Sequence, residues 1–214
     1  MNLIKINFIS SIFIGVIAAF GAMIVQILFS SFFYNQDAQV TLRSGGIVII
    51  AFFSAIEEVF KYVLIFQNHL RIKKSINSIG PEKIEGKLSL EQTESEWKSI
   101  RTHRGSFRSA IFIGLGFAMT EGGLAIFNQD AGLQVLQFGI WGIFIIHIIT
   151  SGIIGYYITN RNILFQSLIL VCVFSLHLLY NSMVLMEFDY IVIYTYFIIL
   201  ASTFALSCRI AKSC

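Results

Sequence analysis

Long apolar stretches alternate with short polar connections along most of this chain, and one long polar segment interrupts the alternation. A helix needs about 20 apolar residues to cross the roughly 30 Å hydrocarbon core of a bilayer. Six stretches come close to or exceed this length, and they cover residues 8–33, 47–66, 109–127, 135–158, 163–186 and 190–208. The pattern therefore predicts an all-α polytopic membrane protein: a single membrane-embedded domain, residues 1–214, built as a bundle of about six transmembrane helices.

The composition agrees with a chain that lies in the lipid bilayer. Hydrophobic residues make up 56% of the sequence and charged residues 13%, and the mean hydropathy is +0.77, which excludes an ordinary soluble domain. The first stretch is longer than the apolar core of a signal peptide, and no small-residue cleavage motif follows it, so we expect it to be retained as a helix. The cysteines, Cys172, Cys208 and Cys214, show neither zinc-site spacing nor a disulfide framework.

The distribution of basic residues predicts the orientation of the helices. The segment 67–108 mixes many Lys and Arg residues with glutamates, and we interpret it as a solvated cytoplasmic loop with a short helix. With six spans, Lys5 and Arg209 then fall on the same side, as the positive-inside rule requires. Both termini are therefore predicted to be cytoplasmic. We interpret His69 and His103, in this segment, as surface histidines, and we expect neither a nucleic-acid nor a nucleotide partner.

The second apolar stretch carries charges where a membrane helix avoids them. It reads FFSAIEEVFKYVLIF over residues 52–66 and contains Glu57, Glu58 and Lys61. Each charge near the middle of a bilayer costs about 2.5 to 3.5 kcal/mol on an insertion scale, so these side chains need partners. On a helix, Lys61 reaches back three or four residues to either glutamate. We expect Lys61 to form a structural ion pair that holds Glu58, which leaves Glu57 for another contact.

Further polar residues interrupt the later stretches: Glu121, His147, His177 and Asn181. With a helical rise of about 1.5 Å per residue, Glu57 and His177 lie about 15 Å from the outer ends of their stretches. The corresponding depths are about 18 Å for His147 and about 12 Å for Glu121. His177 and Asn181 are four residues apart and share one helix face. Residues from four helices are therefore predicted to meet in one layer, and ionisable residues at membrane depth indicate a functional site.

The motifs around these residues resemble the PrsW family of membrane-embedded proteases, part of a wider group with the CAAX-processing and bacteriocin-processing enzymes. The matching pieces are Glu57-Glu58-x-x-Lys61, the segment GLGFAMTEGG with Glu121, His147 in HIITSGIIGYY, and His177-x-x-x-Asn181 in LHLLYN. They follow one another on successive predicted helices over roughly residues 47–181. One departure is Gly122, where the family commonly has an asparagine.

The resemblance implies an intramembrane peptidase of the glutamic type in the bacterial plasma membrane, with a single-span membrane protein, by family analogy an anti-sigma factor, as substrate. A glutamate desolvated in a helix bundle has the raised basicity needed to activate water. We assign this role to Glu57, with His177 orienting the water or protonating the leaving amine and Asn181 donating to the oxyanion. The predicted catalytic residues are Glu57, Glu58, Glu121, His147, His177 and Asn181.

Other functions stay open at this point. No cofactor is favoured, but two histidines and a glutamate form a recognised zinc set, here His147, His177 and Glu121, although the spacing H-E-x-x-H is absent. Buried glutamate and histidine relays also occur in proton-coupled transporters. A non-catalytic scaffold that binds other helices through glycine-rich faces is the third alternative.

Overall fold

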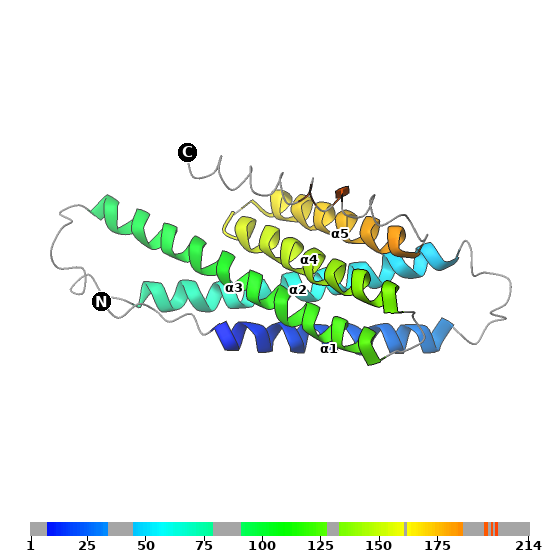
Figure 1. Cartoon of the computed structure of the whole chain (residues 1–214). Coiled ribbons are helices and arrows are strands. Elements are labelled where there is room, and N and C mark those ends of the chain that lie inside the picture. The colour runs from blue at the N-terminus through cyan, green and yellow to red at the C-terminus, as the bar shows by residue number, and fades with distance from the viewer. Residues whose placement is uncertain are drawn as a thin grey trace.

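A computed structural model of the chain describes residues 8–33, 45–78, 91–127, 133–160 and 162–185, together with residues 195, 196, 198 and 200. Five helices occupy these ranges: α1 (Phe8–Phe33), α2 (Gly45–Asn77), α3 (Glu91–Phe127), α4 (Leu133–Tyr157) and α5 (Ile163–Leu185). They run alongside one another as an elongated bundle (Figure 1). No strand occurs in the described ranges, so the all-α prediction is confirmed for them.

Four segments of the described helices are long and apolar enough to cross a membrane, namely Phe8–Ser31, Lys98–Phe127, Ile140–Tyr157 and Ile163–Val184. Helix α2 is not one of them, and it is the helix that carries Glu57, Glu58 and Lys61 within its apolar part. The predicted sixth stretch, 190–208, lies mostly outside the described residues, as do both termini. Six spans and cytoplasmic termini therefore remain predictions.

Helices α2 and α3 extend well into the segment predicted to be a loop. Helix α2 continues to Asn77 and α3 begins at Glu91, and the two extensions project together beyond the other helices at the left of Figure 1. His69 lies between them, only 7% exposed, with its Nδ1 atom 2.8 Å from Ser106 Oγ. The interpretation of His69 as a surface histidine is therefore wrong, because packing against α3 covers a residue that lies in a segment rich in charged residues.

This buried histidine predicts a pH dependence of stability. Burial, and then the charges of Lys73 and His103, hold the pKa of His69 below its ordinary value. As the pH falls below about 6.5, the ordinary histidine pKa, the unfolded chain binds a proton that the folded chain does not, so stability decreases. We expect the free energy of unfolding in detergent to fall between pH 7 and 5, and His69→Gln to reduce that slope. An unchanged slope in the variant would contradict this origin.

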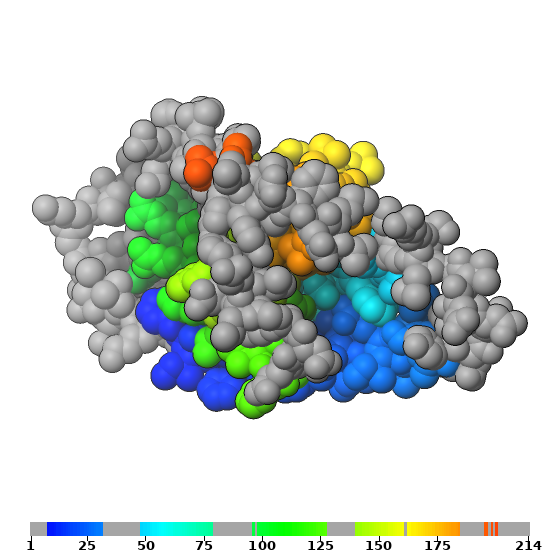
Figure 2. Space-filling model, turned by 45° about the vertical axis from the view of Figure 1, so that its right-hand side comes forward, coloured from blue at the N-terminus to red at the C-terminus, as the bar shows by residue number. Residues whose placement is uncertain are grey.

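Glycines bring helix α1 into backbone contact with α3. A Cβ atom on Gly15 would lie 2.0 Å from the carbonyl oxygen of Ile113, and one on Gly116 would lie 2.1 Å from that of Ile12. Small residues allow membrane helices to approach this closely. Figure 2 shows the side chains of α1, in blue, against those of the α3 end, in green. The crossing places α1 beside the centre of the bundle.

We expect Gly116→Ala to destabilise the protein by about 1 to 3 kcal/mol, because the atom it meets is backbone and α1 must move away. The matched control is Gly123→Ala on the same helix, since a Cβ there meets nothing within 4 Å. The control should stay within about 0.5 kcal/mol of wild type. Equal stability of the two variants in a detergent unfolding titration would show that the crossing is looser than described.

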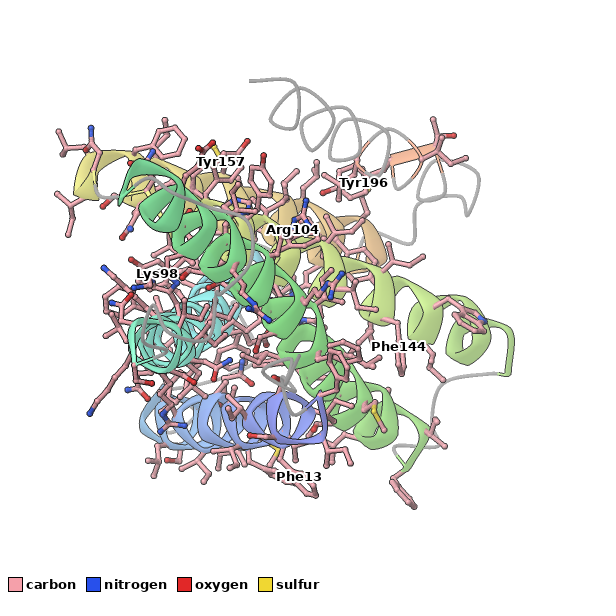
Figure 3. All side chains as sticks on the ribbon, turned by 90° about the vertical axis from the view of Figure 1, so that its left-hand side faces the viewer. Phe13, Lys98, Arg104, Phe144, Tyr157 and Tyr196 are labelled. Atoms are coloured by element: carbon pink, nitrogen blue, oxygen red, sulfur yellow. The ribbon has the colours of Figure 1, made fainter. Side chains whose placement is uncertain are left out.

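Apolar side chains fill the bundle and also cover its outside. One core cluster joins Ala18, Ala19 and Ala22 of α1 to Phe117 of α3. On the opposite side of α1, Phe13 is 62% exposed and points away from the other helices (Figure 3). Exposed phenylalanine and isoleucine on an apolar helix suit contact with lipid. The face of α1 that carries small residues thus packs against other helices. The face that carries large apolar residues suits contact with lipid.

Candidate active site

Three charged residues in the apolar part of α2 lie inside the bundle together with ionisable residues of three other helices. We use the name polar cluster for Glu57, Glu58 and Lys61 of α2, Glu121 of α3, His147 of α4 and His177 of α5. Glu58, Lys61 and His147 are completely buried, and His177 is 1% exposed. All of the ionisable residues singled out at membrane depth therefore meet in one place.

Lys61 is the centre of this cluster. Its ammonium donates to Glu58 Oε1, to Thr150 Oγ1 at 2.9 Å and to His147 Nδ1 at 3.1 Å. These three acceptors use all three ammonium protons. The ion pair predicted between Lys61 and Glu58 is present, and it provides the neutralising partner that a buried charge requires.

The contact with Lys61 decides which nitrogen of His147 carries the proton. An ammonium group only donates, so Nδ1 of His147 accepts and the ring proton sits on Nε2. That N–H donates to Glu121 Oε2 at 2.6 Å. The His147 ring is packed between Phe117, at 4.8 Å between ring centroids, and the edge of His177, at 5.0 Å. His147 thus connects Lys61 to Glu121 through one accepted and one donated hydrogen bond.

His177 lies between the two adjacent glutamates. Its Nδ1 atom is 2.7 Å from Glu58 Oε1 and its Nε2 atom is 3.3 Å from Glu57 Oε2. Glu58 Oε1 therefore has two donors, Lys61 and His177, whereas Glu58 Oε2 is buried without a hydrogen-bond partner among the described residues. Glu58 is thereby held as the counter-charge of Lys61.

Glu57 has a different environment from its neighbour. Its Oε1 atom accepts a hydrogen bond of 2.8 Å from Gln26 of α1, and Oε2 faces His177. The residue is 8% exposed, compared with 0% for Glu58, and the Glu121 side chain is 28% exposed. Glu57 and Glu121 are therefore the carboxyl groups that a small molecule such as water can reach.

Asn181 lies one helical turn beyond His177 but outside the polar cluster. Its Nδ2 atom donates to Ser54 Oγ at 2.9 Å, and Ser54 is three residues before Glu57 on α2. Ser54, Thr150 and Gln26 also contact these residues, and no motif predicted them. Of these, Gln26 had a signal, because it is the one carboxamide in the first apolar stretch.

The histidines and glutamates also raise the question of a metal. Glu57, His147 and His177 can each offer a ligand atom such that the three atoms lie within 4.8 Å of one another, a set with Glu57 where the sequence suggested Glu121. However, Nδ1 of His147 faces the Lys61 ammonium and its Nε2–H is bonded to Glu121. Both nitrogens of His147 are engaged in these contacts, so a metal ion would have to displace Lys61 or Glu121 to bind this ring.

No protein-family model, curated protein or solved structure matches this chain. The resemblance to the PrsW family therefore depends on the four short motifs alone.

Proposed function

We propose that this protein is an intramembrane peptidase in which Glu57 activates a water molecule. The observation that carries the proposal is the pairing of Glu57 Oε2 with His177 Nε2 at 3.3 Å, within a buried cluster surrounded by apolar helices. A carboxylate and an imidazole in direct contact can both reach one water molecule that lies beside them. The motif resemblance to membrane-embedded proteases supports the same reaction class.

The proposed reaction needs only groups of this chain and water. Glu57 accepts a proton from water while the water oxygen bonds to the peptide carbonyl carbon. The carbon–nitrogen bond then breaks as His177 or the protonated Glu57 delivers a proton to the leaving nitrogen, which yields a carboxyl and an amine terminus. Asn181 keeps one N–H after its bond to Ser54, and we assign that N–H to the developing oxyanion.

The two adjacent glutamates receive different roles. Glu58 is completely buried and shares one oxygen between Lys61 and His177, so a water molecule has no access to it. Glu57 is slightly exposed, and its Oε1 atom accepts one hydrogen bond from the Gln26 amide while Oε2 faces His177. We therefore assign the role of general base to Glu57. Glu58 then orients His177, and Lys61 orients His147.

The substrate we propose is a single-span membrane protein, by family analogy an anti-sigma factor, in a bacterial plasma membrane. Glu57 lies 12 residues after the start of α2 and 20 before its end, on the side predicted to face outward. The cut is therefore expected in the outer half of the bilayer. Cleavage mapped near the cytoplasmic surface would contradict this placement.

The test is cleavage of tagged single-span membrane proteins in cells that carry wild-type protein or equally abundant Glu57→Gln. A fragment made only by the wild type supports the proposal. Purified protein in liposomes, with the same substrate and a zinc chelator, then tests the metal: retained cleavage agrees with a glutamate mechanism, and loss that zinc restores overturns it. A fragment that persists with Glu57→Gln would refute the assignment.

One observation favours a second candidate, a proton-coupled transporter. A continuous series of polar contacts runs from Glu121 through His147, Lys61, Glu58 and His177 to Glu57. Glutamate and histidine groups linked in this way mark proton paths in membrane proteins. Proton flux into liposomes that stops with Glu121→Gln, without any cleavage, would favour transport. A scaffold would keep its cellular role with either substitution.

A further inference from the structure

The first helix contributes a polar side chain to the candidate active site, and no motif in the sequence predicted it. Gln26 of α1 places its Nε2 atom 2.8 Å from Glu57 Oε1 and 3.4 Å from the carbonyl oxygen of Phe53. Phe53 is one turn before Glu57 on α2, so the amide spans that turn. Gln26 is partly buried, and an amide that leaves water is costly unless it is hydrogen-bonded; Glu57 provides the partner.

Close packing delivers Gln26 to this position. Ala22 lies four residues earlier on the same face of α1 and is 1% exposed, and Ala18 is completely buried. Gly21, next to this face, has the ring of Phe60 of α2 2.6 Å from where its Cβ would be. The small residues let α1 approach α2, and the first long polar side chain that follows reaches Glu57.

The two oxygens of Glu57 consequently have partners on two different helices. Gln26 of α1 binds Oε1, and His177 of α5 faces Oε2 at 3.3 Å. Without the amide, the plane of the carboxyl group could turn about its last bond, so that neither oxygen would stay directed at His177 Nε2. With the amide, Oε2 stays toward His177, where the proposed water would be shared.

We propose that Gln26 is a positioning residue that holds Glu57 with one oxygen turned to His177. The inference rests on the proposed peptidase function. It extends the site to helix α1, which lies outside the part of the chain that resembles known membrane proteases.

The test compares Gln26→Met, which keeps the length and removes the donor, with the matched control Gln166→Met. Gln166 accepts from the Tyr62 hydroxyl at 2.7 Å and donates to the carbonyl of Ile158, away from the polar cluster. For Gln26→Met we expect kcat to fall about 10- to 100-fold with KM within about twofold, since misplacing a catalytic group costs rate rather than binding. The control should retain wild-type kcat.

A second readout does not depend on cleavage. The infrared band of the Glu57 carboxyl group is identified by its loss in Glu57→Gln, and it should change frequency in Gln26→Met but not in Gln166→Met. If the wild type cleaves and the band or kcat of Gln26→Met is unchanged, the positioning role is overturned while the proposed function stands. If the wild type cleaves no substrate, the proposed function fails and the positioning role fails with it, even where the band shift reports the contact.

Discussion

Lys61→Met is expected to destabilise the bundle by about 3 to 5 kcal/mol, the cost of removing one partner of a buried ion pair. Lys61 and Glu58 are both completely buried, and methionine keeps much of the aliphatic stem while it removes the charge. Glu58 would then lose its ion-pair partner, and Nδ1 of His147 would lose its donor. The measurement is the free energy of unfolding in a detergent titration that follows helix content.

The double variant Glu58→Gln with Lys61→Met separates charge from packing. Removing both members of a buried pair leaves no uncompensated charge, so the double variant should regain at least half of the lost stability. Glu58→Gln alone should be nearly as unstable as Lys61→Met, because the ammonium is then buried without its counter-charge. If Lys61→Met stays within about 1 kcal/mol of wild type, the pair is not buried as described.

Glu57→Gln is expected to lower kcat by about 10² to 10⁴-fold, the usual contribution of a general base, while the protein remains folded. The substitution keeps the shape of the side chain and the acceptor that Gln26 uses, but an amide cannot take a proton from water. The measurement is single-turnover cleavage of a reconstituted membrane substrate alongside an unfolding titration.

The two adjacent glutamates should respond differently to replacement by glutamine. Glu57→Gln should lose rate without losing stability, whereas Glu58→Gln should lose stability because it disturbs Lys61. Glu57→Asp, which shortens the side chain by one methylene, should retain a proton acceptor but fall away from His177, so an intermediate rate is expected. Full activity of Glu57→Gln together with inactivity of a stably folded Glu58→Gln would transfer the base to Glu58.

The layer of ionisable residues is the part of the site that could be predicted from the sequence. A charged side chain in an apolar stretch needs a partner, and helix geometry converts position along the stretch into depth. Glu57, His147 and His177 could therefore be expected to meet, and the structure places them together. Their catalytic roles remain proposals, because depth along a helix does not determine which group binds water.

The ion pair of Lys61 with Glu58 was predicted from helix spacing and is present. Most of the other partners could not be predicted in the same way. Gln26 and Thr150 looked like isolated polar residues, and only the approach of α1 and α4 gives them contacts. His69 was misinterpreted for the same reason, because a partner on α3 buries it.

The sequence by itself determined the helical, membrane-embedded character of this chain, because apolar length and the cost of buried charge are local properties. The tertiary structure decided that His177 contacts both glutamates, that His147 donates to Glu121, and that Gln26 reaches Glu57. These contacts depend on the rotation and separation of helices, which glycines and alanines at the crossings set. The consequence of a small residue appears only when the neighbouring helix is in place.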